Sequence, residues 1–383
     1  MISEGVSRGE ISMKKIILLI FCFFFFPCTS YAALFEPEKG CYLGAYILED
    51  QRAKNDPVKF AELTGKKHAA YFTYVGYGQP FPKNWAEKTK QGGAALHIAF
   101  EPNSGPDVVK DNSYLQGFMR AAAETNVPIF LRFASEMNGN WTAYSGNPKK
   151  YKEVWKTIYR VARREAPNVA MVWVPFQAPQ SNMLNFYPGN EYVDWIGMNI
   201  YCVYVHNGDP KALSYKEDPL EFLSYLYKRI PNKPFFIGEF GVSHHCRVTG
   251  NQVKFATEKY NRMYKGMKKY PRVKAIFVFD SDAINKHKKH NDYSLTGKIL
   301  DHYKNLIQDP YFLSNVQGYR DVNGFLVPEQ KRNQKIYVHA RAIAKALNEN
   351  ISWDPKKITV GNKSFRISDE AFSEAGIGWV IWR

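Results

Sequence analysis

The sequence predicts an α/β fold in which a closed (β/α)8 barrel is followed by a small C-terminal α+β domain. The first observation is a set of eight short apolar segments, rich in β-branched and aromatic residues, between Cys41 and about Pro310. The second is that amphipathic segments with helical spacing separate them. Apolar strands that alternate with helices indicate a parallel sheet covered by helices. Eight such strands fit a closed TIM barrel better than an open doubly wound sheet.

The predicted strands are each several residues long. They are CYLGAYI, HAAYFTYV, ALHIAFE, VPIFLRFA, VAMVWVPF, VDWIGMNIY, PFFIGEFG and VKAIFVFD. The predicted helices between them are DPVKFAELTGK, WAEKTKQG, YLQGFMRAAAETN, PKKYKEVWKTIYRVARRE, DPLEFLSYLYKRI and QVKFATEKYNRMYKGMKKY. Pro148 after Asn147 marks a helix start. No Gly-rich phosphate-binding motif follows the first strand, which weakens a dinucleotide-binding alternative.

The pattern changes after about Leu313, where SNVQGYRDVNGF predicts a connection. The run KIYVHARAIAKALNENISWDPKKITVGNKSFRI then predicts strand, helix, strand, turn and strand, with apolar residues at helical spacing in the helix. We therefore predict a signal peptide at 1–33, the barrel at 34–313 and a small α+β domain at 314–383.

The N-terminus has the features of an export signal. Lys14 and Lys15 precede an apolar run at 16–26, and the small residues Ala32 and Ala33 follow it. We expect cleavage after one of these alanines; an uncleaved N-terminal anchor is the alternative. No later segment is long and apolar enough to cross a bilayer. The expected location is outside the cell, either secreted or associated with the cell surface.

Charge and cysteine content fit an exported protein. The net charge of +16 would indicate nucleic acid inside a cell, but outside it indicates anionic wall polymers, polysaccharide or lipid headgroups. The basic residues are dispersed, except for KHKKH at 286–290. Cys202 and Cys246 each follow a strand end, and we predict a disulfide between them. No spacing indicates a metal site, and we expect no cofactor and no nucleic-acid partner.

Two strand ends carry glutamates suited to glycoside hydrolysis. Glu136 follows the fourth strand and Glu239 lies at the end of the seventh. In a parallel barrel both reach the C-terminal mouth, where active sites form. Retaining glycosidases place an acid/base carboxyl about 5 Å from a nucleophilic carboxylate. We predict Glu136 as the acid/base and Glu239 as the nucleophile; the alternative for either is a strand-end salt bridge.

Neighbouring residues predict a sugar-binding groove. Asn138 and Trp141 follow Glu136 on a loop that would line it. Trp141 and Tyr144 would stack on sugar faces or else pack on the loop. Tyr201, at the end of the sixth strand, would donate a hydrogen bond to the nucleophile. His97, in the third strand, either points into the mouth or belongs to the core, the more usual case.

The segment LRFASEMNGNW resembles the acid/base segment of glycoside hydrolase family 26, the β-mannanase-like enzymes. The pattern is matched by Arg132, Glu136, Met137, Asn138, Gly139 and Trp141. FIGEFG resembles the nucleophile segment with Glu239, VDWIGMNIY the strand-six segment with Tyr201, and HIAFEPN the strand-three segment with Glu101. The resemblance implies substrate-binding roles for Arg132, Asn138, Trp141, Tyr201 and Glu101.

Two positions depart from the family pattern. Ser135 stands where the family has His, and Phe279-Asp280 stands where many members present an aromatic platform, often Trp. Both changes would lie close to the sugar at the cleavage point. The resemblance therefore does not identify which polysaccharide is the substrate.

The tail segment IYVHARAIAKALNENISWDPKKITV resembles the small N-terminal stalk domain of copper amine oxidases. This resemblance implies a spacer or an attachment to cell wall or matrix, and neither copper nor oxidase chemistry. The predicted function is an exported retaining endo-glycoside hydrolase acting on a β-linked polysaccharide: a mannan-like polymer, another β-glucan or an exopolysaccharide. The alternative is a barrel protein that binds cell-surface or matrix glycan without cutting it.

Overall fold

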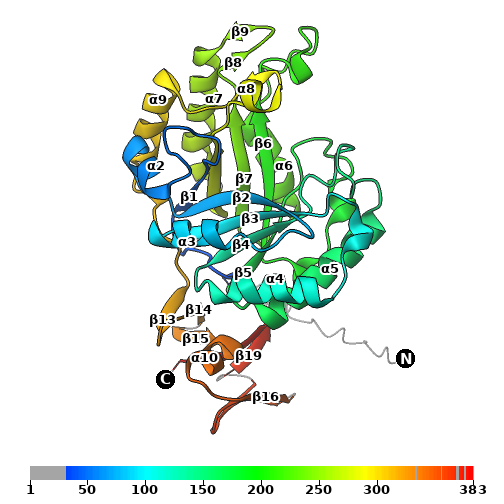
Figure 1. Ribbon diagram of the computed structural model, residues 1–383, viewed down its shortest axis with the longest axis vertical. Helices are drawn as coiled ribbons and strands as arrows, with labels where there is room; N and C mark the ends of the chain where they lie inside the picture. The colour runs from blue at the N-terminus through cyan, green and yellow to red at the C-terminus, as the bar shows by residue number, and fades with distance from the viewer. Residues whose placement is uncertain (1–31, 333, 355, 368–370, 375–376, 383) are drawn as a thin grey trace, which may run out of the picture. The chain divides into compact units, whose positions relative to one another are not determined.

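Eight parallel strands close into a barrel in the computed structural model, which describes residues 32–382 except 333, 355, 368–370 and 375–376. They are β1 (Cys41–Tyr46), β2 (Ala70–Gly76), β3 (Ala95–Glu101), β4 (Ile129–Phe133), β5 (Val169–Trp173), β6 (Trp195–Cys202), β7 (Phe235–Val242) and β10 (Val273–Phe279). Each strand pairs with the next, and β10 pairs with β1 to complete the circle (Figure 1). The predicted (β/α)8 barrel is confirmed.

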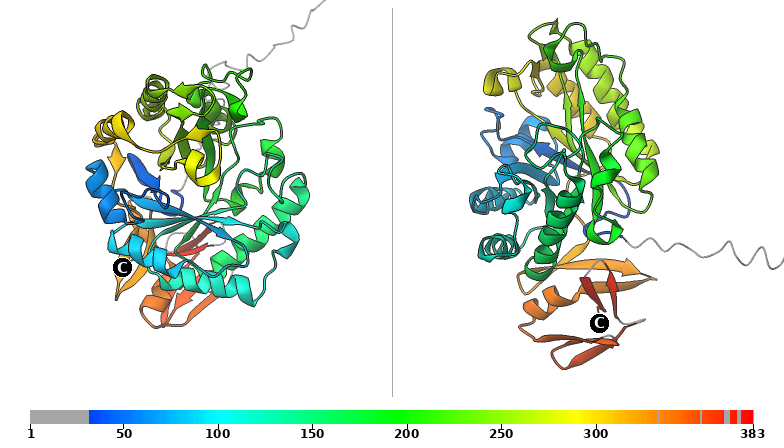
Figure 2. Two further views of the ribbon diagram at one scale, coloured as in Figure 1. Left: turned by 45° about the horizontal axis from the view of Figure 1, so that its top comes forward. Right: turned by 90° about the vertical axis from the view of Figure 1, so that its right-hand side faces the viewer.

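Helices surround the strands (Figure 2). They are α2 (Pro57–Thr64), α3 (Lys83–Gln91), α4 (Ser113–Glu124), α5 (Pro148–Glu165), α6 (Pro219–Arg229), α7 (Val253–Gly266) and α9 (Gly297–Ile307). All six predicted helices are present, and α9 and the short α8 (Ala283–His287) are additions. The Asn147 side chain caps α5 by accepting from the Lys150 N–H at 3.0 Å, and Pro148 occupies the first turn. Between β5 and β6 the described chain forms only short 3-10 turns, η2 (Met183–Phe186) and η3 (Asn190–Tyr192).

The barrel interior is aromatic, and His97 belongs to it. The His97 ring is fully buried and stacks on Phe72 with ring centroids 4.4 Å apart. Neither ring nitrogen has a hydrogen-bond partner among the described residues. Burial, and then the nearby Arg132 charge, hold the pKa of His97 well below its usual value, so the ring is neutral. His97 is therefore a core residue and does not point into the mouth.

The C-terminal residues form two antiparallel sheets and one helix. The first sheet contains β13 (Tyr319–Val322), β14 (Phe325–Arg332), β15 (Lys335–His339), β19 (Ala371–Glu374) and β20 (Ile377–Ile381). The second contains β16 (Ile351–Asp354), β17 (Lys357–Val360) and β18 (Lys363–Arg366), and α10 (Ala340–Ala346) follows β15. The predicted order of strand, helix, strand, turn and strand is confirmed from β15 to β17, and β18 is an additional strand in the same run.

The segment predicted as a connection, SNVQGYRDVNGF, is instead part of a hairpin. It contains β13 and the turn into β14, which pair antiparallel. Asn323 and Gly324 have φ values of 53° and 80°, and an Asn-Gly pair is the residue choice that such tight hairpin turns favour. The Asn323-Gly324 pair is thus a local sequence signal for this hairpin.

The predicted disulfide is wrong. Cys41, Cys202 and Cys246 are all buried and free. Cys202 lies opposite Val242 in the β6–β7 register, and the chain then turns so that Cys246 pairs with Asn291. Residues 1–31 of the export signal predicted at 1–33 lie outside the described residues. In the part of the chain that the structure describes, no helix has the length and apolar character needed to cross a membrane.

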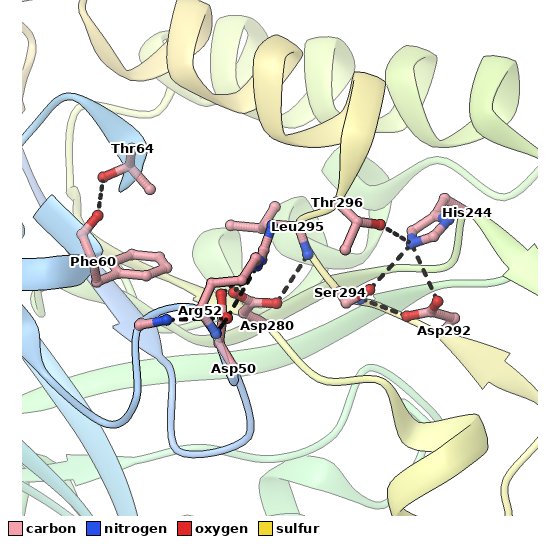
Figure 3. A network of polar contacts seen from close by, with 11 residues as sticks. Asp50, Arg52, Phe60, Thr64, His244, Asp280, Asp292, Ser294, Leu295 and Thr296 are labelled. Atoms are coloured by element: carbon pink, nitrogen blue, oxygen red, sulfur yellow. Dashed lines mark hydrogen bonds and ion pairs between the residues drawn. The ribbon is translucent and has the colours of Figure 1, made fainter. Parts of the chain in front are cut away.

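Two buried carboxyl groups connect the loops after β1 and β10 (Figure 3). Arg52 binds Asp50 through both its Nε, at 3.1 Å, and its Nη2, at 2.6 Å. Asp280 accepts from the Leu295 N–H at 2.9 Å, and its other oxygen lies 3.8 Å from Arg52 Nη2. Burial, and then the adjacent Asp50, raise the pKa of Asp280 well above its usual value. Burial also acts to raise the pKa of Asp50, but the hydrogen bonds it accepts outweigh burial and lower that pKa. Asp280 therefore holds the proton of the pair.

We expect Asp280→Asn to flatten the pH dependence of stability. Between the ordinary carboxyl pKa of 3.8 and the higher native pKa, native Asp280 holds a proton that the unfolded chain releases. The free energy of unfolding of the parent protein therefore falls as pH rises through that window, and the asparagine variant lacks this contribution. Urea unfolding from pH 4 to 8 measures the difference in slope. Asp50→Asn removes the second cause of the raised Asp280 pKa, so it should narrow the same pH window, and the loss of the Arg52 partner should cost about 1–3 kcal/mol at neutral pH.

Candidate active site

The C-terminal ends of the barrel strands open into one cleft with a volume of about 950 Å³. The strand-end glutamates predicted from the sequence meet in it. Its lining includes Glu136, Glu239, Tyr74, Trp141, Phe176 and Tyr201. Apolar and aromatic walls with a few convergent polar groups are typical of a ligand site.

Glu239, on β7, is held by three donors. Arg132 Nη2 and the Tyr74 hydroxyl, at 2.8 Å, donate to its Oε1. The Tyr201 hydroxyl donates to its Oε2, which is the hydrogen bond predicted from the sequence. These contacts fix the plane of the carboxylate, and the side chain is 4% exposed. The three donors therefore hold this carboxylate in one orientation at the cleft.

One amide and one guanidinium connect Glu239 to Glu136. Arg132 Nη1 donates to Asn199 Oδ1 at 2.8 Å. Asn199 Nδ2 in turn donates to Glu136 Oε1 at 2.8 Å, and Trp141 Nε1 donates to Glu136 Oε2 at 3.0 Å. The two carboxyl groups are thus positioned relative to each other by a shared hydrogen-bond network.

The environment gives Glu136 the titration of a general acid. Burial, and then the negative charge of Glu239, raise its pKa to about 7. The hydrogen bond from Asn199, the Arg132 charge and the Trp141 N–H act in the opposite direction. A carboxyl that is about half protonated near neutrality can give a proton and take it back, as acid/base catalysis requires.

The backbone around Glu136 is strained and braced. Ala134 and Glu136 have φ values of 46° and 59°, in the left-handed region that favours glycine. Between them, the Ser135 hydroxyl donates to Glu101 Oε1 at 2.6 Å. The Tyr144 hydroxyl contacts both Glu101 Oε2 and the Ser135 carbonyl oxygen, the latter at 2.8 Å. Glu101 thus holds in place the turn that presents Glu136.

Removing this brace is expected to slow catalysis more than it weakens the fold. Ser135→Ala deletes the hydroxyl that ties the turn to Glu101, and we expect kcat/KM to fall about tenfold, the scale of one lost hydrogen bond of about 1–1.5 kcal/mol. Thr64→Val is the matched control, because it removes another buried hydroxyl, bonded to the Phe60 carbonyl at 2.8 Å. Equal kcat/KM in both variants, with equal unfolding midpoints, would contradict a positioning role for Ser135.

Two residues predicted to bind substrate are buried beneath the site instead. Arg132 is fully buried, with its guanidinium 4.7 Å from the Phe72 ring centroid, and it contacts Glu239 without lining the cleft. Asn138 is 1% exposed. Its amide bonds the backbone of Phe176 and Pro179 and fixes the loop after β5. The structure places both residues under the cleft rather than on its wall, and their direct contact with substrate stays a prediction.

Glu101 and Tyr144 differ from prediction in a related way. Both line the cleft but are 8% and 4% exposed, and each bonds the other. Burial raises the pKa of Glu101. Their hydrogen bonds support the turn that carries Glu136, while the substrate contact of Glu101 and the stacking by Tyr144 stay predictions. Trp141 is 53% exposed in the cleft, where its ring is open to a ligand.

Residues 112–270 match the family model Glycosyl hydrolase family 26. This stretch is similar to glycosyl hydrolase family 26. The matched stretch carries both glutamates, Arg132 and Tyr201, and it runs from the start of α4 into the turn after α7. It covers less than half of the chain.

Known proteins similar to this region are named for different polysaccharides. The chain is 27% identical over 133 residues to "Beta-1,3-xylanase TXYA" of Vibrio sp, covering 33% of this chain and 26% of that protein. It is 31% identical over 129 residues to a mannan endo-1,4-beta-mannosidase of Bacillus subtilis, covering 30% of this chain and 31% of the relative. The similarity thus spans less than a third of each relative's length.

A solved structure agrees with the fold over most of the chain. The modular endo-β-1,4-mannanase of Cellulomonas fimi superposes with a TM-score of 0.53 and 13% identity, covering 92% of this chain and 94% of that one. At this identity the likeness supports the barrel architecture alone. The resemblance of the tail to the copper amine oxidase stalk domain stays a prediction.

Two residues of the site were missed from the sequence. Tyr74 lies near the end of β2, where its hydroxyl reaches Glu239, and the residue is 44% exposed. Asn199 lies on β6 and bridges Arg132 and Glu136. A signal for Asn199 existed, since a lone amide in the apolar run VDWIGMNIY needs partners when buried. Tyr74 had no such signal, because HAAYFTYV is rich in aromatic residues throughout.

Proposed function

We propose that this protein is an exported, retaining endo-glycoside hydrolase that cleaves a β-linked polysaccharide, with Glu136 as acid/base and Glu239 as nucleophile. The observation that carries the proposal is the joint positioning of two carboxyl groups through Arg132 and Asn199, with different environments for each. One is bonded to three donors, and the other has a pKa of about 7. Pairs of carboxyl groups with such contrasting environments divide the acid and nucleophile roles.

The chemistry follows from this division. Protonated Glu136 donates its proton to the glycosidic oxygen as the bond to the leaving sugar breaks, and Glu239 attacks the anomeric carbon. Once the glycosyl–Glu239 ester forms, the negative charge of Glu239 is gone, and the pKa of Glu136 falls. Glu136 is then a base that removes a proton from water, and this water releases the sugar with its original configuration.

The test is the release of reducing ends from a panel of polysaccharides. Because the relatives are a β-1,3-xylanase and a mannan endo-1,4-beta-mannosidase, the panel should include β-1,3-xylan and β-1,4-mannan, together with β-glucans and the producer's exopolysaccharide. Proton NMR of the first product distinguishes retention, which gives the β-anomer first, from inversion. Absence of cleavage across the panel, or an α-anomer first, would sink the proposal.

A second candidate is a barrel that binds glycan without cutting it. Phe279 stands where many family members present a platform, and its ring stacks on Tyr46 at 4.9 Å with an interplanar angle of 8°. One ring face is therefore covered and not open to a sugar. Binding to a member of the panel with no release of reducing ends would favour this function.

The acid role makes a prediction about pH. Because the pKa of Glu136 is about 7, we expect kcat/KM to fall as pH rises through about 7, where the proton to be donated is lost. Trp141→Phe removes the N–H that stabilises the ionised form, so the alkaline limb should move to higher pH. Phe222→Leu changes another cleft-lining ring that makes no hydrogen bond, and it should leave the limb in place. An unmoved limb in Trp141→Phe would contradict the assignment of the acid.

Location and attachment complete the proposal. The N-terminal features of an export signal support a secreted or cell-surface protein. The resemblance of the tail to a stalk domain supports contact with cell wall or matrix. The test is a pull-down on isolated cell walls that compares residues 1–383 with a version ending at 313. A smaller bound fraction of the shorter version would show that the tail is needed for attachment.

A further inference from the structure

The basic segment 286–290 reaches the rim of the cleft. Lys289 and His290 line the cleft, as does His206 from the loop after β6. Lys289 is the one lysine among the described residues that line it. Lys286 instead lines a separate small cavity with Glu49 and Asp50. The segment thus presents one fixed positive charge to whatever occupies the cleft.

The backbone of this segment is anchored on both sides. α8 (Ala283–His287) ends at Lys288, which has a φ of 54°. The N–H groups of Lys288 and Lys289 both donate to the Ala283 carbonyl, the latter at 3.0 Å. On the other side, the Arg247 N–H donates to the His290 carbonyl at 2.9 Å. Lys289 therefore projects from a defined backbone, so little backbone entropy is lost when this residue binds a ligand.

The nearby acidic side chains are engaged with histidines. Glu217, which also lines the cleft, lies 2.8 Å from His206 Nε2. Glu49 lies 2.6 Å from His287 Nε2. None of the ion pairs found in the described part of the chain includes Lys289. On the cleft floor, the Glu239 charge already faces Arg132. The amine of Lys289 is therefore available to an anion from outside.

We propose that Lys289, together with His290, forms a subsite for a carboxylate carried by a sugar of the bound glycan. An exposed lysine is most often simply solvated, and the position of Lys289 on the cleft is what distinguishes it. A point charge at the rim would select an acidic polysaccharide over a neutral one of the same backbone. The proposal rests on the proposed function only in taking the cleft as the glycan site.

Two hexasaccharides with the same linkage test the subsite. Mannohexaose and the β-1,4-linked mannuronate hexamer differ only by the C6 carboxylates. Titration calorimetry in a Glu136→Gln background, which prevents turnover, gives both affinities. We expect the parent to bind the mannuronate hexamer more tightly. Lys289→Gln should weaken that binding about three- to fivefold, the range of a partly solvated ion pair, and leave mannohexaose unchanged.

Lys288→Gln is the matched control, because it removes the same charge from an adjacent residue that does not line the cleft. Equal weakening by both variants would indicate general attraction to a basic protein and would overturn the subsite. So would an unchanged affinity in Lys289→Gln, or no binding of the mannuronate hexamer.

The proposed hydrolase is judged separately, by release of reducing ends from the panel with Glu136 restored. Cleavage with no Lys289 effect overturns the subsite alone. A Lys289 effect without cleavage of any glycan overturns the hydrolase alone.

Discussion

Glu239→Gln is expected to lower kcat/KM by about 10⁴-fold or more on any polysaccharide that the protein cleaves, because the carboxylate that bonds to the anomeric carbon is missing. Glutamine keeps one oxygen that can accept from Arg132 and Tyr74, which bond Glu239 Oε1 in the parent. The fold should therefore survive, although the buried Arg132 charge loses its counterion. Circular dichroism and the unfolding midpoint check this before activity is interpreted.

Azide rescue separates the two glutamates. In Glu239→Ala, azide fits the space left by the carboxylate and restores a negative charge beside Arg132. With an activated β-aryl glycoside it should yield the α-glycosyl azide, because attack comes from the side of the nucleophile. In Glu136→Ala, azide enters after the ester has formed and should yield the β-glycosyl azide. Identical products from both variants would reject the assigned roles.

The fold was predictable because its signals are local and repeated. Each barrel strand is a continuous apolar run, and caps such as Asn147 with Pro148 mark helix starts. The region between β5 and β6 departs from the regular pattern, since it makes 3-10 turns rather than an α-helix. The short strands β8 (His245–Cys246), β9 (Gly250–Asn251) and β11 (Asn291–Asp292) were also missed. They are two residues long, too short to have a periodicity.

The site was predictable in part. Residue type and position at a strand end indicate which residues lie near the mouth of the barrel, but not how deeply each side chain is buried. Glu136, Glu239 and Tyr201 meet where expected. The substrate-binding role predicted for Arg132 came from the resemblance of its segment alone. On β4, alternation turns it into the barrel, where it contacts Glu239. Burial of this kind depends on seven other strands, and no local pattern encodes it.

Arg132→Met is expected to lower both stability and activity. Arg132 is fully buried, and Glu239 Oε1 accepts from it. Removing one partner of a buried ion pair leaves the other charge uncompensated and costs about 3–5 kcal/mol of unfolding free energy. The same change frees the Asn199 amide that orients Glu136, so kcat should fall by about 10²-fold or more even where the protein is fully folded.

A second buried ion pair supplies the control that distinguishes these two effects. Arg163 and Asp194 are 7% and 5% exposed at the side chain and form an ion pair outside the cleft. Arg163→Met should cost a similar unfolding free energy and leave kcat and the alkaline limb of the pH profile unchanged. Arg132→Lys keeps the charge but loses the planar guanidinium that reaches Glu239 and Asn199 at once. Compared with Arg132→Met, it should therefore restore more of the unfolding free energy than of kcat. If Arg132→Met and Arg163→Met keep equal kcat when folded, then Arg132 only stabilises the barrel, and the orientation of Glu239 must come from Tyr74 and Tyr201 alone.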